Sequence, residues 1–109
     1  MASRRSTNFH EDARGNALHF GEDLTIKVAG NPVYIIGRLF KRTLFGKKLI
    51  QIEQTGSKQN PEKDSITFEM KERKNGVTQP MPRGKYTVTN YAYFTGEGGR
   101  MWSDKFEIV

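Results

Sequence analysis

Apolar and polar side chains alternate along several short stretches of the chain. Residues 24–28 (LTIKV) and 66–71 (ITFEMK) place an apolar side chain at every second position. This period of two predicts β-strands with one buried and one solvated face. Residues 86–94 give the strongest such pattern, and a glycine-rich turn at 96–99 leads into a last strand over 102–109.

A denser apolar run, VYIIGRLF, covers residues 33–40. It predicts a central strand buried on both faces, in which Gly37 marks a bulge or a point of close approach. A turn around Phe45 and Gly46 and a returning strand over residues 49–53 complete a β-hairpin. We expect the leucine and phenylalanine side chains of this hairpin to face the core.

Turn signals recur about every eight to twelve residues, and no stretch has a convincing helical period. The pattern predicts an all-β fold, an antiparallel sandwich of about six or seven strands over residues 21–109. Residues 1–20 lack a regular period and predict an extended N-terminal arm. We expect Arg4, Arg5 and Phe9 of this arm to contact a neighbouring subunit.

The last third of the chain contains two short segments with a family-like pattern. They are Pro82, Gly84, Tyr86 and Val88 at the start of one strand, and Ser103, Asp104, Phe106 and Ile108 in the next. Over residues 81–109 the pattern resembles the closing hairpin of immunoglobulin-like and fibronectin-like sandwiches. The resemblance implies that Tyr86 forms a tyrosine corner, with its hydroxyl bonded to nearby backbone. It also implies adhesion, decoration or assembly rather than catalysis.

The chain contains no cysteine, which excludes disulfides, thiolate metal sites and the antibody branch of that family. It also has no apolar segment long enough to span a bilayer, so we expect no membrane partner. A short, cysteine-free sandwich with a polar arm is similar in type to small structural subunits of bacteriophage heads, necks and tails. That resemblance implies a location in a virion or in the host cytoplasm.

Positive charge is concentrated in one hairpin. The net charge is +6, and residues 37–49 contain five basic side chains and no acid. These are Arg38, Lys41, Arg42, Lys47 and Lys48. Alternation along the strand divides the charges between two faces, which is unlike a stripe that follows phosphates. An acidic protein surface, nucleic acid, and protection of a sheet edge all remain open as explanations.

Tyr91 and Tyr93 are predicted to lie on the sheet face opposite Tyr86. Two tyrosines in line on a sheet face suit a protein interface, cross-strand packing or the stacking of a ligand. Together with Trp102 they could form a carbohydrate-binding surface. All three explanations are open at this point.

No motif indicates a reaction. His10 and His19 lie nine residues apart in the arm without a known metal-ligand spacing, so we expect exposed histidines and no metal site. No serine stands in a nucleophile elbow, and the loop at 96–100 lacks the context of a phosphate-binding loop. We therefore expect no catalytic residue and no cofactor.

The function expected from the sequence is that of a non-enzymatic structural or interaction module in a larger assembly. Its partners would be protein subunits, including copies of itself. A nucleic-acid-binding module that uses hairpin 38–48 is the alternative, and a carbohydrate-binding module is a weaker one.

Overall fold

A computed structural model describes residues 5–109 of the chain. Within this range the chain forms eleven β-strands and no helix, which confirms the all-β class. Consequently it contains no helix that could cross a membrane. The strands are β1 (Arg5–Thr7), β2 (His10–Asp12), β3 (Gly15–Leu18), β4 (Leu24–Val28), β5 (Tyr34–Thr43), β6 (Gly46–Gln54), β7 (Ser65–Phe68), β8 (Lys71–Lys74), β9 (Val77–Pro80), β10 (Gly84–Phe94) and β11 (Gly98–Ile108).

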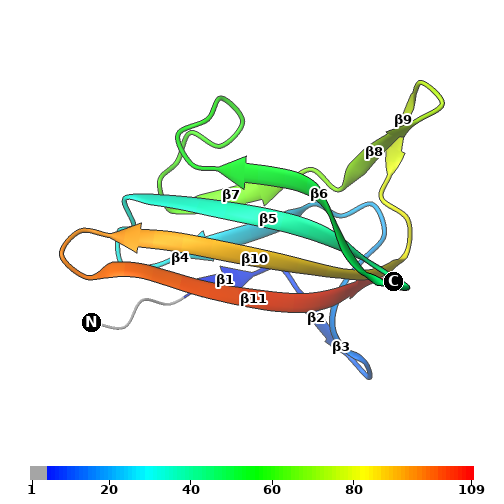
Figure 1. The fold of residues 1–109 in the computed structure, drawn as a ribbon, viewed down its shortest axis with the longest axis horizontal. Coiled ribbons are helices and arrows are strands. Elements are labelled where there is room, and N and C mark those ends of the chain that lie inside the picture. The colour runs from blue at the N-terminus through cyan, green and yellow to red at the C-terminus, as the bar shows by residue number, and fades with distance from the viewer. Residues whose placement is uncertain (1–4) are drawn as a thin grey trace.

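Two sheets form the body of the molecule, and the β8–β9 hairpin extends from one end (Figure 1). The larger sheet has the order β2-β3-β11-β10-β5-β6, and the smaller has the order β1-β4-β7. All neighbouring strands are antiparallel except β3 and β11. This pair departs from the antiparallel arrangement expected from the sequence. Backbone hydrogen bonds from Phe20 and Val109 continue the parallel pair, at 3.0 Å to Val109 and 2.9 Å to Leu18.

The structure contains more strands than the six or seven predicted. The additional ones, β1, β2, β3, β8 and β9, are three or four residues long and too short to show a period in the sequence. The first three lie in the segment predicted as an arm. From Arg5 onward this segment is paired with both sheets: β1 with β4, and β3 with β11.

The core lies between the two sheets. Strand β4 contributes Leu24, Ile26 and Val28, and the larger sheet contributes alternate residues of β5 and β10 such as Leu39 and Val88. Tyr86 is also fully buried, and its hydroxyl donates a hydrogen bond of 2.7 Å to the backbone oxygen of Pro82. Burial raises the pKa of Tyr86 to about 12, and the nearby charge of Glu72 adds to this effect. The tyrosine is therefore neutral and donates this bond at any ordinary pH.

The prediction that residues 33–40 are buried on both faces is wrong. Ile35, Gly37 and Leu39 point into the core, whereas Tyr34 and Arg38 on the other face are exposed. The smaller sheet covers only one side of the larger one, so the other side of β5 meets solvent. The outward positions of this strand include apolar residues, so the sequence showed no alternation of apolar and polar side chains. The exposure of one face could therefore not be predicted from periodicity.

Gly37 is a point of close approach, as the sequence predicted. A Cβ atom at this position would lie 2.6 Å from Cδ1 of Ile66 and 2.8 Å from Cζ of Phe68, both on β7. It would also lie 2.7 Å from Oδ1 of the buried Asn90. The bulge lies further along, where the register of β5 and β6 shifts between Leu39 and Phe40. Gly37 therefore lets β7 lie directly on the middle of β5.

We expect Gly37→Ala to destabilise the protein by about 1–3 kcal/mol, the usual cost of overpacking a core. The added methyl group would push β7 away from β5. Urea unfolding measures the change, and Gln54→Ala, at an exposed position in the same sheet, is the control. An unchanged unfolding midpoint for Gly37→Ala would show that the two sheets are not closely packed at this point.

Candidate functional site

The candidate site is the uncovered side of the larger sheet, called here the outer face. It is formed by outward side chains of the four strands β6, β5, β10 and β11. From one end to the other they include Tyr34, Tyr91, Tyr93, Met101, Ile52, Arg38, Leu49, Phe40, Arg42, Lys47, Lys85 and Lys105. The end with Tyr34, Tyr93 and Met101 is aromatic and apolar, and the end with the last four residues of this list is basic. The face therefore has an apolar end and a basic end.

Three tyrosines pack together at the apolar end. Tyr34 lies opposite Tyr93 in the sheet, with ring centroids 5.6 Å apart, and its ring centroid lies 6.0 Å from that of Tyr91. Tyr91 also lies across Gly99, where a Cβ atom would collide with its ring. Desolvation by its neighbours, with the interaction with Tyr91, raises the pKa of Tyr34, so the group carries no charge at neutral pH. The tyrosines therefore make cross-strand contacts and still leave an exposed surface.

Basic side chains from three strands meet at the other end. Arg42, Lys85 and Lys105 line one open depression of about 220 Å³. Glu107 lies beside them, but its Oε2 atom is 2.6 Å from Nη1 of Arg14 and is neutralised by it. Arg14 is a fourth basic residue of the depression, and within residues 5–109 no ion pair involves the other three. This end of the outer face therefore has an uncompensated positive charge.

The register of the hairpin β5–β6 determines which of its charges belong to this face. Arg42 lies opposite Lys47, and the Lys47 ammonium is 4.5 Å from the centre of the Phe40 ring on the outer face. Lys41 lies opposite Lys48, one residue along, so both side chains point to the other side of the hairpin. Two of the five predicted basic residues are thus separated from the other three.

The end of this hairpin is apolar and exposed. Leu44 and Phe45 form the turn between β5 and β6, and their relative exposures are 91% and 96%. The tip lies at the same end of the molecule as the C-terminus (Figure 1). The prediction that the leucines and phenylalanines of the hairpin face the core is wrong for all but Leu39, which is fully buried. A two-residue turn at the end of a sheet has no second layer to cover it.

Of the three arm residues predicted to contact a neighbouring subunit, two lie within the described structure. Arg4 lies outside the described residues. Arg5 contacts the chain's own body: its Nη2 atom donates to Oδ1 of Asp104 at 3.0 Å, and its guanidinium lies 5.4 Å from the ring of Trp102. Phe9 packs on Phe106 with ring centroids 5.0 Å apart. These contacts use the inner side of β11, so Trp102 does not share a face with Tyr91 and Tyr93.

The two histidines are exposed, as predicted, and lie side by side. His10 and His19 stack with their ring centroids 4.1 Å apart, and both are close to the carboxylate of Glu22. Among residues 5–109 this is the only group of three metal-ligating side chains whose donor atoms converge. It lies at the edge of the larger sheet formed by β2 and β3, beyond β11.

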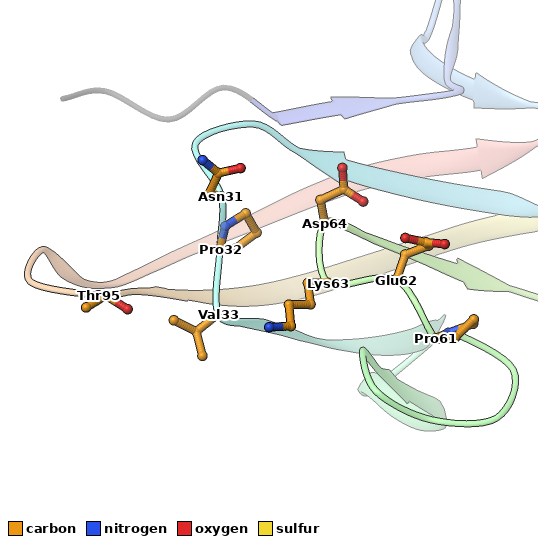
Figure 2. A pocket seen from close by; sticks show the side chains of 8 residues that line it. All are labelled: Asn31, Pro32, Val33, Pro61, Glu62, Lys63, Asp64 and Thr95. Carbon is orange, nitrogen blue, oxygen red and sulfur yellow. The ribbon is translucent and has the colours of Figure 1, made fainter.

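A hollow lies beside the loop between β4 and β5 (Figure 2). It is open, has a volume of about 770 Å³, and is lined by three loops. Glu62, Lys63 and Asp64 supply its charges. Figure 2 shows the Lys63 side chain extending away from both carboxylates, so these groups do not converge on a ligand position.

The chain matches no protein-family model, no curated protein and no solved structure. Its function is therefore inferred from the arrangement of its own residues.

Sequence reasoning missed Tyr34, Lys85 and Lys105, which the structure adds to the outer face. Alternation places Lys85 on the same side of its strand as Tyr91, and this signal was available in the sequence. The strand order was not available, and it is what puts Lys85 and Lys105 beside Arg42 and Tyr34 beside Tyr93.

We expect Arg5→Ala to cost about 1.5 kcal/mol of stability, because it leaves the carboxylate of Asp104 without its charged partner. The Asp104 side chain is only 14% exposed. Arg14→Ala is the matched control, since it breaks an ion pair whose arginine is 69% exposed, against 42% for Arg5, and whose carboxylate, on Glu107, is 20% exposed. Such surface pairs contribute less than about 1 kcal/mol. Urea unfolding measures both variants. If Arg5→Ala and Arg14→Ala lowered the free energy of unfolding equally, Arg5 would have no special role in holding β1 to the body.

Proposed function

We propose that the protein is a non-enzymatic interaction module of a larger assembly, and that its basic hairpin and outer face bind an acidic surface of a protein partner. The observation that carries this proposal is the hairpin tip, where Leu44 and Phe45 are almost fully exposed between Arg42 and Lys47. Exposed apolar groups with a rim of one charge sign are typical of a protein interface. The charge favours a partner of opposite sign.

The remainder of the outer face supports the same proposal. Leu49 and Ile52 on β6 extend the apolar surface from the tip along the sheet, with relative exposures of 44% and 52%. Met101 on β11 is 71% exposed. These groups lie on the same side as the basic depression, so one partner surface could cover them together with the charges. The apolar contacts would supply affinity, and the basic residues would supply orientation and rate of association.

The finer fold class is part of the proposal. We assign the two sheets to the immunoglobulin-like sandwiches, and the hydrogen bond from Tyr86 to Pro82 supports this because it has the form of a tyrosine corner. The proposed setting is a virion, as a component of a phage head, neck or tail. The small size of the chain and its uncovered sheet face are compatible with a subunit that is completed by its neighbours.

Two double variants of the hairpin test the proposal. Arg42→Glu with Lys47→Glu reverses the cross-strand pair on the outer face, and Lys41→Glu with Lys48→Glu reverses the pair on the other side. Both variants change the net charge by the same amount at nearly the same distance from the tip. We expect the first to weaken partner binding by about 100-fold or more, because it places repulsive charge in the contact, and the second by less than about tenfold.

The measurement is capture of partner protein from nuclease-treated lysate of the producing cells by the immobilised chain, followed by titration of the captured protein. Cross-links from Lys47, Lys85 or Lys105 to acidic segments of the captured protein would locate the contact. Equal binding by both double variants, or cross-links confined to the opposite side, would contradict the proposed face.

Nucleic acid is the second candidate, and one specific observation favours it. Arg42, Lys85 and Lys105 line a single depression, with Lys47 nearby on the same face as the tyrosines. The charges on this face are thus more concentrated than the sequence indicated. A basic groove in line with exposed aromatic rings is a common arrangement for single-stranded nucleic acid.

If nucleic acid is the partner, affinity for a single-stranded oligonucleotide should fall steeply with salt. A slope of about −3 in a plot of log K against log salt concentration corresponds to four or five phosphate contacts. Fluorescence anisotropy at several salt concentrations measures this slope. A flat response, or equal affinity of both double variants, would exclude the second candidate without affecting the first.

A further inference from the structure

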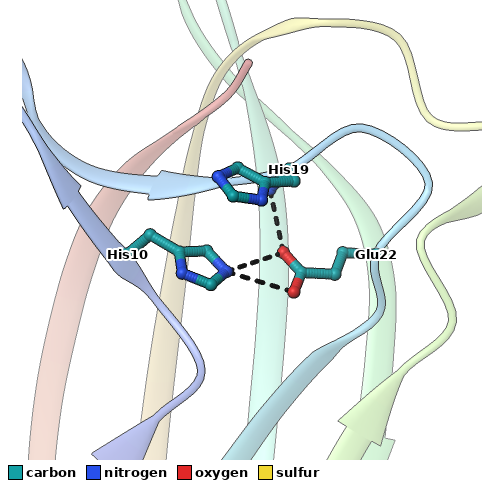
Figure 3. Close-up of side chains that lie close together, drawn as sticks. All are labelled: His10, His19 and Glu22. Carbon is teal, nitrogen blue, oxygen red and sulfur yellow. Dashed lines mark hydrogen bonds and ion pairs between the residues drawn. The ribbon is translucent and has the colours of Figure 1, made fainter.

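His10, His19 and Glu22 form a compact group of potential metal ligands (Figure 3). The Nε2 atom of His10 lies 3.1 Å from Oε2 and 3.2 Å from Oε1 of Glu22. One donor atom from each of the three residues lies within 4.8 Å of the other two. Figure 3 shows both rings next to the same carboxylate. Three ligand atoms of the types that zinc prefers are therefore already together.

Strand pairing brings the two histidines together. His10 on β2 lies opposite Ala17 on β3, so the side chain two residues beyond Ala17 is its diagonal neighbour on the same face. This neighbour is His19. Phe9, which precedes His10, points the other way and packs on Phe106. The apolar contact thus fixes the side of the sheet on which the histidines lie.

A tight turn brings in the carboxylate. The backbone N–H of Glu22 donates to the oxygen of His19 at 3.0 Å, and Gly21 has φ = 88°, which glycine adopts without strain. The backbone N–H of His19 in turn donates to Oε1 of Glu22 at 2.9 Å. This bond holds the carboxylate in place and leaves Oε2 directed at His10. In metal sites, outer-shell hydrogen bonds of this kind orient the side chains that bind the ion.

The distance between one pair of these ligand atoms matches what a metal ion requires. Two ligand atoms bound to one tetrahedral zinc at their usual distances lie roughly 3.3 Å apart. The distance of 3.1 Å between His10 and Glu22 is close to this value. His19 can complete the set by a side-chain rotation, because its ring stacks on His10 without a hydrogen bond to the ring in the described structure.

The group is also open to solvent. The side chains of His10 and Glu22 are 44% and 35% exposed, which leaves room for water as a fourth ligand.

We propose that His10, His19 and Glu22 bind one divalent transition-metal ion of the zinc class. The ion would join β2 to the turn that leads into β4, and so hold the N-terminal strands against the body. The proposal does not depend on the proposed function, because no residue of the group belongs to the outer face or the basic hairpin.

Titration of the untagged protein with Zn²⁺ alone tests this site. Isothermal calorimetry at pH 7.5 should show one ion per chain. His10→Ala and His19→Ala should each weaken binding by at least about 100-fold, the upper cost of losing an outer-shell partner. Glu22→Gln should weaken it by at least tenfold. Glu11→Gln, an equivalent exposed change next to His10 on β2, should leave the affinity unchanged.

Two measurements on the unmodified chain accompany the variants. At a free Zn²⁺ concentration of about 100 Kd, the Tm should rise by roughly 10 °C. Imidazoles must be deprotonated to bind, so the rise should be much smaller at about pH 5.5. In NMR spectra Zn²⁺ should shift the ring signals of His10 and His19 together.

Three results would overturn the proposal. They are a Tm that does not respond to Zn²⁺, ring signals that do not move, and equal affinities of Glu11→Gln and the histidine variants. In each case the group would be an ion pair between His10 and Glu22 with a stacked second ring.

Discussion

The packing of β4 and β7 against the inner side of β5 and β10 is the contact on which the rest of the molecule depends. It buries one face of the central strands, and the absence of a side chain at Gly37 allows β7 to come close. The smaller sheet has three strands and the larger has six, so it can cover only one side. The outer face of the larger sheet follows from this one-sided burial.

The outer face results directly from that asymmetry. Among the described residues no second layer covers the outward side chains of β5 and β10, and the strand order β11-β10-β5-β6 places basic groups from all four strands at one end. The same order places three tyrosines at the other end. A continuous hydrogen-bonded sheet carries this surface. Little ordering of backbone would therefore oppose the binding proposed for it.

The N-terminal segment shows a second consequence of strand pairing. Its short strands have little apolar surface of their own, yet they complete the edges of both sheets. Phe9 and Arg5 anchor the segment on β11, and the turn at Gly21 directs Glu22 back toward the histidines. The segment is thus connected to the body by packing, by an ion pair and by the proposed metal ligands.

The sequence by itself determined the all-β class, because alternation along β4, β7 and β10 depends only on residues close together in the chain. For Gly37 the sequence left a bulge or a close approach open, and the family resemblance implied a nearby backbone partner for the Tyr86 hydroxyl; the structure has the close approach and the bond to Pro82. Only the tertiary structure decided which strands are neighbours and which face is covered, since the period of two is the same on either side of a sheet. The grouping of Lys85 and Lys105 with Arg42, and of the two histidines with Glu22, depends on contacts between distant strands and on a single turn. Strands as short as β2 and β3 have too few residues to show a period of two, so the sequence did not predict those contacts.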